Sequence, residues 1–165
     1  MTAPRHYGPR HSSTARAPQG RARWSSADSE RVLEAATSRV LLAEDDSDMR
    51  KLLSGALRRQ GYDVIELSNG TDVLSYLGSS TLRPGQFAPP DLVISDVRMP
   101  GASGLSILVE LRRAGWELPF ILCTAFGDDA LHSQAAKLGV RVFDKPFDIP
   151  HLVQYAASVQ SPMGA

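Results

Sequence analysis

The 165-residue chain lacks the cysteine pairs of many secreted proteins and the long apolar runs of membrane proteins. Cys123 is its single cysteine, so no disulfide can form within the chain, and the cytosol is the default compartment. No apolar run approaches the roughly 20 residues that a membrane-spanning helix needs. The N-terminus also lacks the hydrophobic stretch of a secretory signal. We therefore expect a cytoplasmic protein that makes no membrane contact.

The first 38 residues have few aliphatic side chains and an excess of positive charge. Residues 1–25 contain five arginines and no acidic residue, and they include Pro4, Pro9 and Pro18. A segment of this composition cannot bury enough apolar surface to offset the entropy lost on ordering. We predict a disordered tail over 1–38, a domain over 39–160 and a C-terminal end at 161–165. Contact of the arginines with nucleic acid is the alternative for the tail, and such binding would weaken steeply with salt.

Short apolar runs alternate with helical spacing throughout residues 39–160. The predicted strands are Val40–Ala43, Tyr62–Leu67, Leu92–Ser95, Phe120–Cys123 and Val140–Phe143. We expect helices that begin at a Ser47 cap and at Asn69, helices over Leu105–Ala114 and Asp128–Leu138, and one after Asp148, with a loop over 78–90. Continuous apolar strands are typical of a parallel sheet that is covered on both faces. The pattern thus predicts an α/β, doubly wound, five-stranded parallel sheet.

Polar side chains stand where four of these strands end. The acidic run Glu44–Asp46 follows the first strand, and Asp96 follows the third. Thr124 follows the fourth strand, and Lys145 comes just after the fifth. Because the carboxyl ends of parallel strands meet at one edge, we expect these groups to converge. Crowded carboxylates need a cation, and oxygen ligands suit Mg²⁺, so the pattern indicates phosphoryl transfer to an aspartate.

Four segments resemble the signature stretches of bacterial two-component response-regulator receiver domains. They are VLLAEDDSDMRKLL, DLVISDVRMPGASGL, ILCTAF and FDKPFD, in the expected order and each at a strand end. The resemblance covers residues 39 to about 160 and implies a flavodoxin-like (βα)5 fold with strand order 2-1-3-4-5. It also implies phosphorylation by a sensor histidine kinase or phosphotransfer protein. Signalling would then pass to a downstream protein through the face of the fourth helix, fifth strand and fifth helix.

The resemblance also assigns roles to individual residues. Asp96 corresponds to the phosphoacceptor, which implies a signalling domain that assists its own phosphorylation and dephosphorylation rather than an enzyme. Thr124 and Lys145 correspond to the hydroxyl and the lysine that contact the phosphoryl group, and the Lys145–Pro146 bond is expected to be cis. The implied Mg²⁺ ligands are Glu44, Asp45, Asp96 and the backbone carbonyl of Arg98.

Other functions compete with this interpretation. An aspartate-nucleophile phosphatase of the haloacid-dehalogenase kind needs a second acid two residues after the nucleophile, where Arg98 stands. A flavodoxin-like cofactor binder needs a phosphate-binding loop after the first strand, where this chain has acids that would repel FMN. Two further alternatives stay open: a receiver-like interaction module that is not phosphorylated, and the receiver portion of a larger regulator rather than a stand-alone protein.

One position departs from the family. Receivers commonly have an aromatic residue three positions before the lysine, and here that position is Val142. The nearest aromatic residue is Phe143. Because side chains alternate between the two faces of a strand, we predict that Phe143 packs in the core and that Val142 faces outward.

Overall fold

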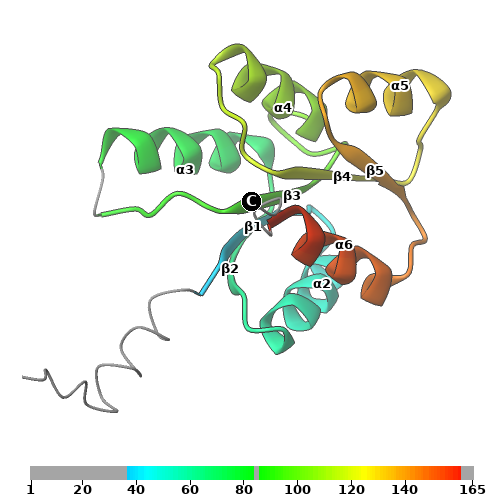
Figure 1. Ribbon diagram of the computed structural model, residues 1–165, viewed down its shortest axis with the longest axis horizontal. Helices are drawn as coiled ribbons and strands as arrows, with labels where there is room; N and C mark the ends of the chain where they lie inside the picture. Colours follow the sequence, from blue (N-terminus) through cyan, green and yellow to red (C-terminus); the bar gives the residue numbers. More distant parts are fainter. Residues whose placement is uncertain (1–36, 84–85, 161–165) are drawn as a thin grey trace, which may run out of the picture. The chain divides into compact units, whose positions relative to one another are not determined.

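One parallel sheet organises the protein in the computed structural model, which describes residues 37–83 and 86–160 (Figure 1). The strand order is β2-β1-β3-β4-β5, which confirms the predicted fold class and order. The strands are β1 (Arg39–Ala43), β2 (Asp63–Leu67), β3 (Leu92–Asp96), β4 (Phe120–Thr124) and β5 (Arg141–Asp144). The helices are α2 (Ser47–Arg59), α3 (Gly70–Leu82), α4 (Gly104–Arg113), α5 (Asp129–Lys137) and α6 (Ile149–Gln160).

Some predictions fall outside this range. The predicted disordered tail lies outside the described residues except for Thr37 and Ser38, and so does the segment 161–165. Both stay predictions. Among the described helices, none combines the length and the apolar character that a membrane crossing requires.

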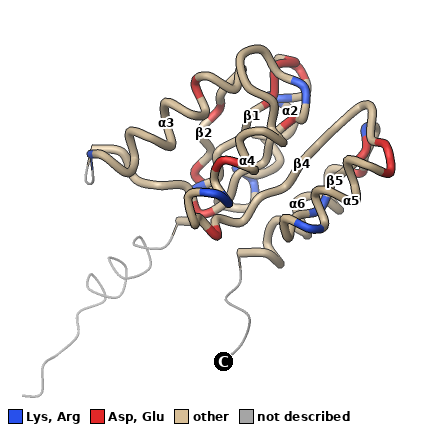
Figure 2. Tube along the Cα trace, turned by 90° about the horizontal axis from the view of Figure 1, so that it is seen from above, with Lys and Arg blue, Asp and Glu red and all other residues tan. Residues whose placement is uncertain are grey.

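Helices cover both faces of the sheet, so the core has two layers. Helices α3, α4 and α5 lie on one face, and α2 and α6 lie on the other (Figure 1). Alternate strand residues feed opposite layers: Leu41 packs toward α3 and α4, whereas Leu42 packs toward α2 and α6. Strand β4, which lies next to the central strand β3, carries no charged residue along its length (Figure 2). Burial of each such leucine contributes about 1.5–3 kcal/mol, which explains why the strands read as continuous apolar runs.

The cap of α2 differs from the prediction. Asp46, rather than Ser47, is the N-cap residue, and its Oδ1 accepts hydrogen bonds from the backbone N–H groups of Asp48 and Met49 at 2.9 Å. Asp46 has an extended backbone and stands outside the helix, whereas Ser47 is already the first helical residue. Asp46, the last acid of the Glu44–Asp46 run, therefore caps helix α2.

The predicted loop over 78–90 is partly wrong because α3 continues to Leu82. The hydroxyl groups of Ser80 and Thr81 both donate to the carbonyl oxygen of Leu77, at 2.8 and 3.1 Å. Such bonds let polar side chains remain inside a helix, although their residue types favour turns. A serine-rich sequence therefore looked like a loop where the chain stays helical.

The two residues at the centre of β5 face opposite layers. Phe143 is 5% exposed and packs against the rings of Phe147, His151 and Tyr155, so its predicted core position is confirmed. Val142 lies on the other side, as alternation requires, but it is only 8% exposed. The prediction that Val142 faces outward is therefore wrong, because α5 contributes to a core layer that covers it.

Candidate functional site

Three carboxylates meet at the carboxyl ends of β1 and β3. Glu44, Asp45 and Asp96 each place an oxygen atom within 4.8 Å of the other two. The sheet register causes this proximity, because Ala43, the last residue of β1, pairs with Ser95 of the adjacent strand β3. Glu44 is 1% exposed and Asp96 is 8% exposed, whereas Asp45 is exposed to solvent. The predicted acidic cluster thus exists as a buried pair with one exposed member.

Lys145 bridges the two buried carboxylates. Its Nζ donates to Glu44 Oε2 at 2.7 Å and to Asp96 Oδ2 at 3.2 Å. The backbone N–H of Lys145 donates to the carbonyl oxygen of Thr124 at 2.7 Å, which aligns the lysine with the end of β4. The Lys145–Pro146 peptide bond is cis, as predicted. The structure therefore brings together residues that are about 100 positions apart in the chain.

Burial and the charge of Lys145 or its partners shift the pKa values of these groups in opposite directions. Burial alone would lower the pKa of Lys145, but the hydrogen bond to Glu44 and the charge of Asp96 raise it above its usual value. Burial raises the pKa of Glu44, and Lys145 opposes that rise. When Lys145 and the carboxylates of Glu44, Asp45 and Asp96 are all ionised, the cluster has one positive and three negative charges, so its net charge is negative. Clustered hard oxygen donors of this kind fit a divalent ion such as Mg²⁺.

The backbone holds the Asp96 carboxylate and the Thr124 hydroxyl in place. The N–H of Arg98 donates to Asp96 Oδ1 at 3.1 Å, and the N–H of Phe126 donates to Thr124 Oγ1 at 3.1 Å. Thr124 is 1% exposed and ends β4, which is hydrogen-bonded to β3. A hydroxyl that accepts a bond in this way still has its own hydrogen to donate to an incoming oxygen.

Sequence reasoning missed Gly104, whose lack of a side chain leaves room for the end of β3 that carries Asp96. A side chain at this position would overlap the backbone carbonyl of Asp96 and the hydroxyl of Ser95. The absence of a Cβ therefore lets the first turn of α4 approach the end of β3 closely. The only signal in the sequence was a glycine immediately before the helix predicted over Leu105–Ala114.

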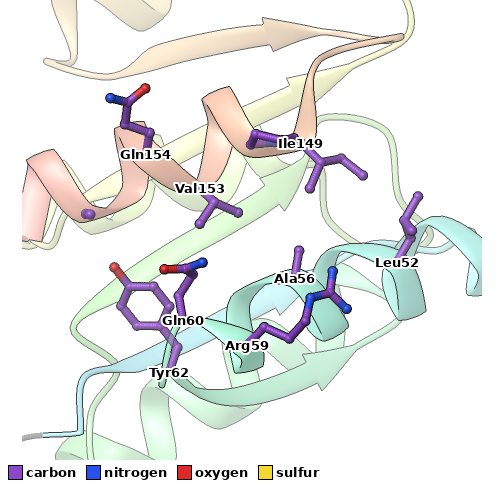
Figure 3. Close-up of a pocket in the computed structure, with 10 residues that line it drawn as sticks. Leu52, Ala56, Arg59, Gln60, Tyr62, Ile149, Val153 and Gln154 are labelled. Carbon is purple, nitrogen blue, oxygen red and sulfur yellow. The ribbon is translucent and has the colours of Figure 1, made fainter.

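A groove outside the carboxylate cluster was also missed. It has a volume of about 680 Å³ and lies between α2 and α6 (Figure 3). Most of its lining side chains are apolar, including Leu52, which is 53% exposed, together with Ile149 and Val153. Helical periodicity in the sequence predicts which face of each helix is apolar, but it cannot show that a gap separates α2 from α6. The groove is an accessible apolar surface formed by the facing sides of α2 and α6.

Fold and site together define a receiver-type α/β domain. A family profile described as "Response regulator receiver domain" matches residues 40–157, so the chain belongs to that family. It is 36% identical over 115 residues to the DNA-binding transcriptional regulator NtrC of Salmonella typhimurium, a match that covers 69% of this chain and 23% of that one. It is 28% identical to sporulation initiation phosphotransferase F of Bacillus subtilis, over 69% of this chain and 86% of that one.

Solved structures agree on the fold. The Francisella response regulator 1452 receiver domain superposes with a TM-score of 0.67 at 22% identity, over 75% of this chain and 97% of that one. The non-phosphorylated HemR receiver domain of Leptospira biflexa gives 0.65 at 25% identity, over 78% and 98%. Receiver domains are phosphoacceptor signalling domains that bind Mg²⁺ at an acidic pocket and interact with histidine kinases or phosphotransfer proteins. Family membership thus sets aside the phosphatase and the flavin-binding alternatives.

Proposed function

We propose that Asp96 accepts a phosphoryl group from a sensor histidine kinase or phosphotransfer protein. The observation that carries the proposal is the bridge from Lys145 to Glu44 and Asp96, which holds a cation against a buried carboxylate. The proposed Mg²⁺ ligands are Glu44, Asp45, Asp96 and the backbone carbonyl of Arg98. When bound, the ion would neutralise charge on the phosphoryl oxygens.

The chemistry is a displacement at phosphorus. A carboxylate oxygen of Asp96 forms a bond to phosphorus while the bond from phosphorus to the donor's imidazole nitrogen breaks, and the electron pair leaves with the imidazole. Lys145 stabilises the negative charge on the transferring group from beside Asp96. Thr124 donates its hydroxyl hydrogen to a phosphoryl oxygen. Thr124 Oγ1 accepts a hydrogen bond from the Phe126 N–H. The contact between Thr124 and the phosphoryl oxygen therefore links the phosphoryl group to the loop after β4.

The groove between α2 and α6 is the proposed docking surface for the phosphodonor. Helix α2 begins two residues after Asp45, and α6 begins four residues after Lys145, so both groove walls start at the site. A donor helix with an apolar face would cover the exposed part of Leu52 and bring its histidine toward Asp96. The downstream target on the face of α5, β5 and α6 stays a prediction.

The rest of the signalling route is also proposed rather than shown. The chain spans about a quarter of the length of the NtrC relatives, so their whole-protein activities do not transfer to it. It acts either alone or as the receiver portion of a larger regulator. In both cases we propose that residues 1–37 are dispensable for folding and phosphorylation, and their deletion should leave the labelling rate and the melting temperature unchanged.

Mass spectrometry tests the phosphoacceptor directly. Incubation with acetyl phosphate and Mg²⁺ should add one labile phosphate to the wild-type chain. The same treatment should add none to Asp96→Ala, and none to the wild type in EDTA. Asp91→Ala is a matched control, since Asp91 lies before β3 and outside the cluster. Phosphate on another residue, or labelling that EDTA does not reduce, would overturn the assignment, and absence of any label would favour the interaction-module alternative.

A further inference from the structure

Arg50, in the first turn of α2, contacts the backbone of the acidic run after β1. Its Nη1 donates to the carbonyl oxygen of Glu44 at 2.7 Å and to the carbonyl oxygen of Asp45 at 3.4 Å. Its Nε lies 3.9 Å from Oε2 of Glu66, a residue of the edge strand β2. The Arg50 side chain is only 20% exposed. Arg50 therefore joins α2 and β2 to the main chain of two proposed Mg²⁺ ligands.

The two carbonyl groups that Arg50 holds lie on either side of the Cα atom of Asp45. The carbonyl of Glu44 belongs to the peptide unit before that atom, and the carbonyl of Asp45 belongs to the unit after it. A peptide unit is planar and rigid, so two held units restrict the direction in which the side chain leaves the backbone. Within residues 37–83 and 86–160, no hydrogen bond or ion pair holds the Asp45 carboxylate itself. The direction of this carboxylate thus depends on the backbone, and Arg50 restrains that backbone.

The same contact influences the carboxylate of Glu44. In a trans peptide unit the N–H points away from the carbonyl, so a held Asp45 carbonyl directs the Asp46 N–H to the opposite side. That N–H donates to Glu44 Oε1 at 3.2 Å, while Lys145 Nζ donates to Oε2 at 2.7 Å. Arg50 consequently acts on both acids through adjacent peptide units.

We propose that Arg50 is a positioning residue for Mg²⁺, an inference that rests on the proposed function. It holds the turn after β1 in the geometry in which the carboxylates of Glu44 and Asp45 converge with Asp96. Because the guanidinium is itself a cation, its charge alone would oppose a second cation nearby. Removal of a positive charge would then strengthen Mg²⁺ binding, whereas removal of a positioning contact weakens it. The sign of the change separates positioning from simple electrostatics.

The test is a titration of the unphosphorylated full chain with MgCl₂, followed by the NMR shifts of its backbone amides. Arg50→Met keeps most of the side-chain length and removes every donor. It should raise the Kd for Mg²⁺ about tenfold, the lower end of the loss that follows removal of a group behind a metal ligand. Arg50→Lys can donate to one carbonyl but lacks the forked geometry, so its Kd should fall between the two. Asp45→Asn removes a proposed ligand and should weaken binding at least as much as Arg50→Met.

Arg58→Met is the matched control, because Arg58 lies on the same helix and also joins it to β2. Its Nη1 donates to Glu66 Oε1 at 2.7 Å, and its Nη2 donates to the carbonyl oxygen of Val64 at 3.0 Å. Its Kd for Mg²⁺ should match wild type. A second measurement follows labelling by acetyl phosphate at increasing Mg²⁺. Arg50→Met should raise the half-saturating Mg²⁺ concentration about tenfold and change the rate at saturating Mg²⁺ far less.

The outcomes separate the positioning role from the proposed function. An unchanged or lower Kd in Arg50→Met refutes the positioning role, and the Mg²⁺ site stands if Asp45→Asn still weakens binding. Equal weakening in Arg58→Met means that the whole fold responds, and the inference is wrong. If Arg50→Met does not fold, Arg50→Lys decides, and a wild-type Kd refutes the role. If the wild-type chain binds no Mg²⁺, or Asp45→Asn binds it like wild type, the proposed metal site fails and the positioning role fails with it.

Discussion

Replacing Lys145 with methionine removes the cation of the site while keeping most of the side-chain volume. Glu44 is then left 1% exposed with no positive partner, next to Asp96. Removal of one member of a buried ion pair costs about 3–5 kcal/mol. Because the Lys145 side chain keeps 16% of its surface in solvent, we expect the lower end, about 3 kcal/mol of unfolding free energy at pH 7.

Urea unfolding in EDTA would measure this loss, and two changes should reverse it. Glu44→Gln in the Lys145→Met background removes the uncompensated charge and should recover about 1 kcal/mol or more. Saturating Mg²⁺ should also narrow the gap, because the folded state alone presents the clustered carboxylates. Lys137→Met, on the exposed surface of α5, is the matched control and should change little. A loss below about 0.5 kcal/mol, or no recovery with Glu44→Gln, would contradict the argument that the lysine stabilises a buried carboxylate.

Further predictions concern docking, backbone approach and pH. Leu52→Ala should slow phosphoryl transfer from a protein phosphodonor about fivefold, because about 1 kcal/mol of leucine burial against the donor is lost, and it should leave labelling by acetyl phosphate unchanged. Equal slowing with both donors would refute the proposal that the donor docks in the groove. Gly104→Ala should slow labelling about tenfold or more by displacing Asp96, whereas Gly78→Ala, which has open space around it, should not. Burial raises the pKa of Tyr62, so its contribution to stability is present below about pH 10 and lost as the pH rises through the folded-state value. Tyr62→Phe should therefore lose less stability than wild type in urea unfolding between about pH 9 and pH 11, and parallel losses would contradict this.

The sequence predicted the architecture because local patterns and topology agree. Continuous apolar runs specify strands that are buried on both faces, and helical spacing between them requires crossovers. Those two features place every strand end at one edge, so Glu44, Asp96, Thr124 and Lys145 could be grouped before any contact was seen. Errors arose where polar residues satisfy the backbone in more than one way, as with the Asp46 cap and the serine-rich end of α3.

Only the tertiary structure decided which side chains are buried and what they touch. Alternation fixed the sides on which Val142 and Phe143 lie, but helix packing decided that both are covered. The same packing leaves a gap between α2 and α6, which helical periodicity cannot show. The Lys145 bridge joins Lys145 to Glu44, 101 positions away, and the guanidinium carbon of Arg98 lies 4.7 Å from the centroid of the Phe126 ring, 28 positions away. No local pattern encodes such contacts, because they depend on side-chain conformations that are set only when separate strand ends come together.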